Sequence, residues 1–132
     1  MVVAVEPDEE LAARAQHALE GTGVINAAVV SGSAVDGAPK QGPFDVILIG
    51  AAIEIDPAAL LKQLKDGGRL GAIVRRNGVS KGVVWTRSGE AFGASEAFDA
   101  SAATIAPGFA RPKAFAFAGR AVTTCTGDSW YW

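Results

Sequence analysis

The residue best placed to take part in chemistry is Glu6, which directly follows the apolar, β-branched run at residues 2–5. In nucleotide-binding α/β proteins, a carboxylate at the end of a buried strand accepts hydrogen bonds from both hydroxyls of a ribose. An acidic residue also occurs at such a position because it precedes a helix, where the helix dipole favours negative charge. The local pattern leaves both interpretations of Glu6 open.

The other reactive residue types lack the neighbours that catalysis needs. His17 falls on the polar side of a predicted helix, and we expect it to be solvated. Cys125, the only cysteine, is expected to be an inert small side chain, and no metal site is expected. Arg69, Arg75 and Arg76 flank a predicted strand and should face solvent, although the last two could meet an acidic ligand at the edge of a sheet.

The elements that would position these residues begin with alternating strands and helices, which is typical of α/β proteins with a mainly parallel sheet. Apolar runs predict strands at 1–5, 27–31, 44–49 and 69–75, of which the third is the most apolar and should be central.

Two helices are predicted between these strands. The first opens at Pro7 and Asp8 and ends at Gly21 and Gly23, and the second opens at Asp56 and Pro57 and ends at Gly67 and Gly68. Their apolar stripes consist of Leu11, Ala15, Ala18 and Leu19 in the first helix and Leu60, Leu61 and Leu64 in the second.

The pattern changes after residue 76, where no further helix is indicated. Residues 82–87, 90–99 and 113–117 are predicted to be antiparallel or mixed strands, with turns at 88–89 and 107–108. Aromatic residues in such strands usually pack in the core, which we expect for Trp85, Phe92, Phe98, Phe115 and Phe117.

Length and charge exclude several classes of protein. The 132 residues make about one domain, and 12 basic against 14 acidic residues give a net charge of −2, which does not favour nucleic acid or an anionic membrane. The longest apolar run, at 46–53, is far shorter than the roughly 20 residues of a membrane span. Acidic residues at 6–10 do not fit a signal peptide. We therefore expect a cytoplasmic protein without nucleic-acid or membrane partners.

Three segments, at 2–15, 44–54 and 61–70, together resemble the part of a class I methyltransferase that follows its glycine-rich loop. The downstream segments 84–89, 97–100, 107–109 and 114–117 resemble the C-terminal region of protein-L-isoaspartate O-methyltransferases. The resemblance covers roughly residues 2–117, which we interpret as a partial methyltransferase domain. Residues 118–132 form a tail outside it.

This resemblance implies a Rossmann-like sheet and the cofactor S-adenosylmethionine. Glu6 would hold the ribose of the cofactor, and Pro7 and Asp8 would border its adenine. Ser33 stands where the family commonly has an aspartate that contacts the adenine amino group. Gly50 and Ala51 would lie near the methyl donor.

The resemblance also implies what the 132 residues lack. The sequence starts after the family's first strand and its Gly-x-Gly-x-Gly turn, and after the N-terminal region that carries the peptide-binding and catalytic residues, so no catalytic residue is identified. In this topology the first strand lies between the strands at 1–5 and 44–49. Its absence would leave two central edges unpaired.

Three functions remain open. The first is methyl transfer to an isoaspartyl carboxylate of a peptide or protein, as in protein repair, with the missing elements supplied by another chain. The second is a catalytically inactive, truncated remnant that acts as an oligomeric structural or binding protein. The third is a different nucleotide-binding module that uses Glu6.

The unpaired edges predict a homodimer, in which a partner edge or residues 120–126 fill the gap. The aromatic residues at 130–132 suggest burial or a subunit contact.

Overall fold

The computed structural model describes residues 1–117 and 120–125, which form three sheets and two helices. The strands are β1 (Val2–Glu6), β2 (Ala27–Ser31), β3 (Phe44–Ile53), β4 (Leu64–Arg76), β5 (Val79–Ser88), β6 (Ala91–Asp99), β7 (Lys113–Phe117) and β8 (Arg120–Cys125), and the helices are α1 (Glu9–Gly21) and α2 (Ala58–Leu61).

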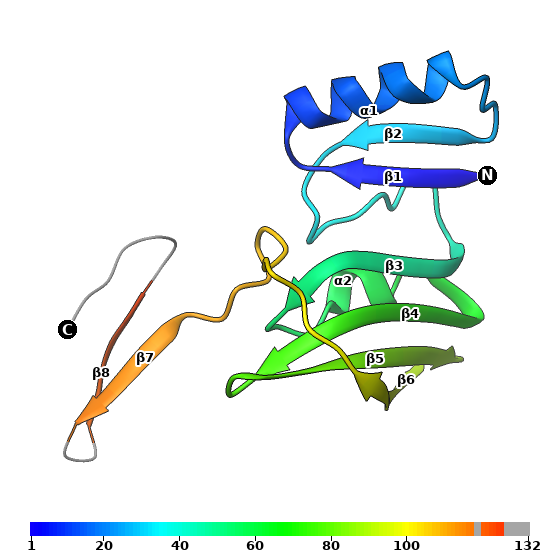
Figure 1. Ribbon diagram of the computed structural model, residues 1–132. Coiled ribbons are helices and arrows are strands. Elements are labelled where there is room, and N and C mark those ends of the chain that lie inside the picture. The colour runs from blue at the N-terminus through cyan, green and yellow to red at the C-terminus, as the bar shows by residue number, and fades with distance from the viewer. Residues whose placement is uncertain (118–119, 126–132) are drawn as a thin grey trace.

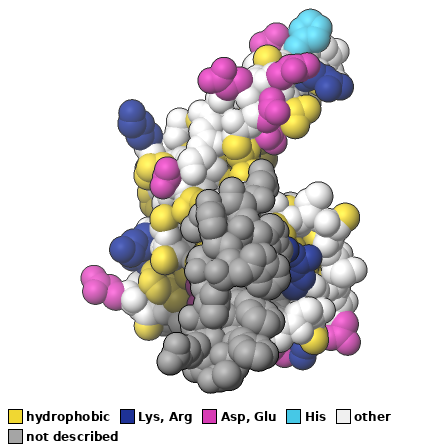
Figure 2. All heavy atoms as spheres, turned by 90° about the vertical axis from the view of Figure 1, so that its left-hand side faces the viewer, with side chains coloured by type: hydrophobic (Ala, Val, Ile, Leu, Met, Phe, Trp, Pro, Cys, Tyr) yellow, Lys and Arg dark blue, Asp and Glu magenta, His cyan; other side chains and the backbone are white. Residues whose placement is uncertain are grey.

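The first sheet consists of β1 and β2, a parallel pair joined by α1. The carboxylate of Asp8 caps α1 by accepting hydrogen bonds from the N–H groups of Glu10 (2.9 Å) and Leu11 (3.1 Å). With Glu9 and Glu10 in the first turn, the N-terminal end of α1 carries the negative charge that its dipole favours. Figure 2 shows acidic side chains gathered at this end of the molecule.

The face that α1 turns to the sheet differs from the predicted stripe. Ala12 is buried and Leu19 is half-buried, whereas Leu11, Ala15 and Ala18 are exposed. The sheet beneath α1 has only two strands, so it covers one narrow row of the helix and leaves the neighbouring apolar row uncovered. The expectation for His17 is confirmed, because its side chain is exposed.

The second sheet has the order β3-β4-β5-β6, in which β3 and β4 are parallel and the later pairs antiparallel. Between β4 and β5, Asn77 and Gly78 both have positive φ (52° and 79°), as a two-residue type I′ turn requires. The structure therefore confirms a mixed α/β fold, with parallel pairs in its N-terminal part (β1-β2 and β3-β4) and antiparallel pairs in its C-terminal part.

The second helix is shorter than predicted, because α2 ends at Leu61. Leu64 was expected in its apolar stripe but instead opens β4, where its side chain is fully buried. The chain has already turned at Gln63, whose carbonyl accepts a hydrogen bond from the Phe44 N–H (2.8 Å). Gly67 and Gly68 are thus not a helix stop; they lie in a register shift of β4 against β3.

The core lies between α2 and the β3–β5 part of the sheet. Ile53, Leu64 and Leu70 are fully buried there, and Trp85 is buried as expected. Phe92 and Phe98 are 37% and 61% exposed, so their predicted core role is wrong. Both belong to β6, the edge strand, all of whose residues are exposed. The side chains of Phe115 and Phe117 lie outside the described part of the protein.

The strands β1, β2, β3 and β4 all run in the same direction, but β1 and β3 do not pair (Figure 1). Residues 104–109 cover the carboxyl end of β3 on this side. Ile105 forms a parallel bridge with Ala52, and Phe109 O accepts a hydrogen bond from Glu54 N–H (2.9 Å). The predicted central gap is therefore present between β1 and the rest of β3.

The third sheet is the antiparallel hairpin of β7 and β8, which projects from the body of the molecule in Figure 1. Residues 120–125 belong to the tail that was one of the two alternatives for filling the gap, and they pair with β7 instead. Residues 126 and 130–132 lie outside the described residues.

Candidate functional site

A groove of about 1090 Å³ lies between β1 and β3. Residues 1–7 line one wall and residues 44–51 line the other, and parts of the 34–43 loop, of the α2 end and of Ala106-Pro107 complete it. The groove thus follows the two strands along most of their length. Its position is the one that the missing central strand was expected to take.

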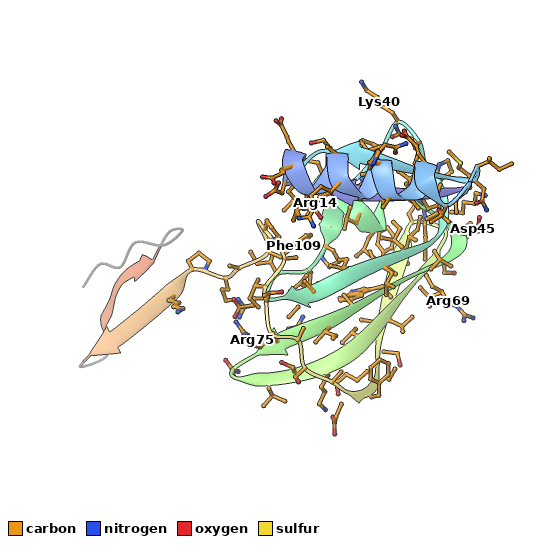
Figure 3. The ribbon with its side chains drawn as sticks, turned by 45° about the horizontal axis from the view of Figure 1, so that its top comes forward. Arg14, Lys40, Asp45, Arg69, Arg75 and Phe109 are labelled. Carbon is orange, nitrogen blue, oxygen red and sulfur yellow. The ribbon has the colours of Figure 1, made fainter. Side chains whose placement is uncertain are left out.

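The carboxyl ends of β1 and β3 meet at one end of this groove. From β1 the chain crosses by α1 to β2, and from β3 it crosses by α2 to β4, so the two crossovers lead away from the groove on opposite sides. Open α/β sheets bind ligands at such a switch point, outside the carboxyl ends of the strands. In Figure 3 Arg75 and Phe109 lie toward this end, whereas Asp45 and Arg69 lie toward the opposite one.

Glu6 is half-buried at the carboxyl end of β1. Its Oε1 accepts a hydrogen bond from Asp8 N–H (3.1 Å), and its backbone carbonyl accepts one from Gly32 N–H (3.2 Å). The first contact fits the interpretation that Glu6 is acidic because it precedes the N-terminus of a helix. The second oxygen, Oε2, has no hydrogen-bond partner among residues 1–117, so the carboxylate keeps an acceptor for a ligand.

Four of the five predicted cofactor residues line this groove: Glu6 and Pro7 on β1 and the turn after it, and Gly50 and Ala51 on β3. A Cβ added to Gly50 would meet no atom within 4 Å, so the wall is open at this point. Ser33 does not line the groove. It is exposed, and its carbonyl accepts a hydrogen bond from Gly37 N–H (3.0 Å) in the loop beyond β2.

Gln63, which the sequence did not single out, fixes the loop beside the groove. Its Oε1 accepts a hydrogen bond from Ala38 N–H (3.1 Å), and its Nε2 donates to Asp36 O (2.6 Å) and Ala59 O (3.2 Å). The side chain therefore ties the 36–38 segment to α2. No sequence signal marks this role, because the partners are backbone groups up to 27 residues away.

Replacing Gln63 with glutamate should lower the free energy of unfolding by about 1 to 3 kcal/mol, because a carboxylate would face two carbonyl oxygens without a donor. Urea unfolding followed by circular dichroism measures this loss. Gln41→Glu is the matched control, since Gln41 is exposed and its side chain makes no hydrogen bond in the described part of the chain. Equal losses in the two variants would contradict the anchoring role of Gln63.

The arginines near the carboxyl end of the sheet already have acidic partners. Arg76 Nη2 lies 2.8 Å from Asp56 Oδ1, and Arg75 Nε lies 3.7 Å from Glu54 Oε2. These pairs weaken the hypothesis that either arginine receives an acidic ligand.

A further ion pair lies on the β5–β6 hairpin. Lys81 Nζ is 2.7 Å from Glu96 Oε2, and this hydrogen-bonded carboxylate raises the pKa of Lys81. The pair is remote from Glu6 and from the β1–β3 groove, so it does not contribute to the candidate site.

The comparison with known families matches residues 1–92 to the model of protein-L-isoaspartate(D-aspartate) O-methyltransferase. The enzyme of that name from Koribacter versatilis is 45% identical over 69 residues, which are 52% of this chain and 31% of the relative. The enzyme from Halorhodospira halophila is 35% identical over 91 residues, which are 69% of this chain and 41% of the relative. The chain thus spans less than half the length of these curated relatives.

Solved structures show the same fold. A protein-L-isoaspartate O-methyltransferase superposes with a TM-score of 0.76 at 22% identity, over 83% of this chain and 35% of the other. A Plasmodium falciparum protein described as a putative member, solved with S-adenosyl-L-homocysteine, superposes with a TM-score of 0.64 at 16% identity. The superposition covers 76% of this chain and 50% of the other. These likenesses show the fold, and the family match over residues 1–92 establishes that the chain belongs to the protein-L-isoaspartate O-methyltransferase family.

Proposed function

We propose that this chain provides the nucleoside half of an S-adenosylmethionine site in a methyltransferase that acts on isoaspartyl carboxylates of peptides or proteins. The observation that carries the proposal is that Glu6, the last residue of β1, and Gly50, in the C-terminal half of β3, line one groove between two strands that run in the same direction. The family's model supports the same activity. S-adenosyl-L-homocysteine in the Plasmodium falciparum structure supports the same cofactor.

The residues present fit the nucleoside part of this cofactor. Glu6 Oε2 would accept hydrogen bonds from the ribose hydroxyls, while its Oε1 stays on Asp8 N–H and holds the carboxylate in place. Pro7 would border the adenine, whereas Ser33 lies outside the groove and would not contact the cofactor from its present position. Gly50 leaves the wall of β3 open for the methionine part of the cofactor, and the small side chain of Ala51 lines the groove beside it.

The bound cofactor would supply a methyl group on a sulfonium, and the protein's task would be to align the acceptor carboxylate with it. The described residues contribute to this task by holding the nucleoside at the edge of the sheet. The elements that bind the methionine end and the peptide would come from outside residues 1–125.

We place this activity in the cytoplasm. In the described part of the chain, no helix is long and apolar enough to cross a membrane.

The proposal predicts weak nucleoside binding that depends on Glu6. We expect this chain to bind S-adenosylhomocysteine or adenosine with a dissociation constant above the micromolar range, because only the nucleoside side of the site is present. Glu6→Gln should weaken adenosine binding about tenfold or more, since a hydrogen bond to a charged acceptor contributes about 1.5 to 3 kcal/mol. Isothermal titration calorimetry at high protein concentration measures both affinities.

Glu10→Gln is the matched control, because it makes the same change of charge on the exposed first turn of α1 and should leave the affinity unchanged. If Glu6→Gln binds adenosine as tightly as the unchanged protein, Glu6 serves only the end of the helix. Submicromolar affinity of this chain alone for S-adenosylmethionine would contradict the proposal that it provides only the nucleoside half of the site.

A further inference from the structure

Three pairs of residues in the chain have asparagine or aspartate directly before glycine. They are Asn77-Gly78, Asp36-Gly37 and Asp66-Gly67. At such a pair, the backbone nitrogen of the glycine can attack the side-chain carbonyl carbon of the residue before it, because glycine has no side chain to obstruct the approach. The folded structure determines which of the three pairs is free to react.

The two Asp-Gly pairs are constrained by hydrogen bonds. The N–H of Gly37 donates to Ser33 O (3.0 Å), so the nitrogen that would attack is engaged within its own loop. In the other pair the carboxylate is engaged, because Asp66 Oδ1 accepts a hydrogen bond from Gly89 N–H (2.8 Å). A carboxylate is also a weaker electrophile than an amide, since it must be protonated before it can lose water. Neither pair therefore combines a free nitrogen with a reactive carbonyl carbon.

The Asn77-Gly78 pair has neither constraint. It forms the turn between β4 and β5, at the edge of the sheet where the parallel strand β3 also ends (Figure 1). Both residues are exposed, and a Cβ added to Gly78 would meet no atom within 4 Å. Within residues 1–117 and 120–125, neither the side chain of Asn77 nor the N–H of Gly78 makes a hydrogen bond. The side-chain amide and the nitrogen that would attack it are thus both open to solvent.

We propose that Asn77 is a site of spontaneous modification, at which deamidation gives the chain an isoaspartyl residue. The Gly78 nitrogen loses its proton to solvent and bonds to Asn77 Cγ. The bond from Cγ to Nδ2 breaks, and Nδ2 takes up a proton from water and leaves as ammonia. Water then opens the resulting succinimide ring. Opening at Cγ gives aspartate, whereas opening at the backbone carbonyl carbon of Asn77 gives isoaspartate, whose main chain runs through Cβ and Cγ.

The turn sets the rate of the first step. Asn77 and Gly78 have the positive φ angles of a type I′ turn, in which the nitrogen of the second residue is directed away from the side chain of the first. Ring closure therefore requires rotation about the Cα–C bond of Asn77, which opens the turn. Such opening costs little free energy at the exposed end of a hairpin, where Arg76 and Val79 form the last pair. We therefore expect conversion in the folded protein, but more slowly than in the unfolded chain.

Peptide mapping of the aged protein tests this inference. The folded protein is kept in mildly alkaline buffer, digested with a protease specific for glutamate, and measured by mass spectrometry with electron-transfer fragmentation, which distinguishes isoaspartate from aspartate. Isoaspartate should accumulate at residue 77 and should be about tenfold rarer or more at residues 36 and 66. Asn26 is the internal control, because it is exposed but precedes alanine, and it should keep its amide. The inference does not rest on the proposed function, since deamidation needs no enzyme.

Asn77→Gly is the matched variant, because glycine keeps the positive φ of the turn and removes the reactive amide. The proteolytic fragment that contains residue 77 should then show no gain in mass. A gain that persists in this variant would assign the deamidation to Gln63, which lies in the same fragment, and would overturn the proposal.

The protein unfolded in urea supplies the reference rate, and residue 77 should convert faster there than in the folded protein. If the folded protein forms no isoaspartate at residue 77 over a time in which the unfolded protein converts, the fold protects this pair and the proposal is wrong. Equal amounts of isoaspartate at residues 36, 66 and 77 of the folded protein would also overturn it, because the structure would then not select Asn77.

Discussion

Replacing Leu70 with alanine should lower the free energy of unfolding by about 3 to 5 kcal/mol, the range for a large aliphatic side chain removed from a well-packed core. Leu70 is fully buried in β4, with Ile47 beside it on β3 and Trp85 opposite it on β5. These neighbours belong to a continuous sheet and cannot collapse easily into the cavity. Urea unfolding followed by circular dichroism should show a lower midpoint with an unchanged slope.

Leu48→Ala provides the matched control on the neighbouring strand. Leu48 is 79% exposed, so the same truncation should change stability by no more than about 0.5 kcal/mol. A loss for Leu48→Ala as large as that for Leu70→Ala would mean that the open face of β3 is covered in solution.

Replacing Gly68 with alanine should destabilise the protein by about 2 to 3 kcal/mol. A Cβ at this position would lie 2.8 Å from the Lys65 carbonyl oxygen and 3.1 Å from those of Phe44 and Asp45. All three obstacles are backbone atoms, so relief requires a movement of β3 against β4. Thermal and urea unfolding of the variant measure this loss in the free energy of unfolding.

Gly71→Ala separates this steric effect from the general effect of replacing glycine. Gly71 lies three residues further along β4, where a Cβ would meet only Leu48 Cδ1 at 3.6 Å. There, alanine should be neutral or stabilising by up to about 1 kcal/mol, because it reduces the conformational freedom of the unfolded chain. If both variants lose the same stability, the close approach at Gly68 does not constrain the protein.

The sequence predicted the parallel part of the fold because strand ends and helix starts are encoded locally. The apolar run before Glu6, the capping residue Asp8 and the apolar run at 44–49 each identify an element without knowledge of its neighbours, although β3 continues to Ile53. Since the carboxyl ends of parallel strands share one edge of the sheet, Glu6 and Gly50 could be placed together in advance. The roles of these residues in binding stay predictions.

Features that depend on tertiary context could not be predicted in this way. Alternating apolar residues suit an edge strand as well as a central one, so nothing in β6 showed that Phe98 would be exposed. The spacing of Leu60, Leu61 and Leu64 suits a helix, yet pairing of Leu64 with Phe44 ends α2 after one turn. Likewise, Gln63 owes its role to a loop that approaches it only in the folded chain.

The contact of residues 104–109 with β3 has a consequence for the order of folding. Glu54 Oε1 accepts a hydrogen bond from Arg111 N–H, a contact between residues 57 positions apart, whereas the β3–β4 and β4–β5 pairings close much shorter loops. Contacts of long sequence separation form late, because their loop entropy is lost before they contribute. During synthesis, we therefore expect the carboxyl end of β3 to stay uncovered until residues 104–109 have left the ribosome.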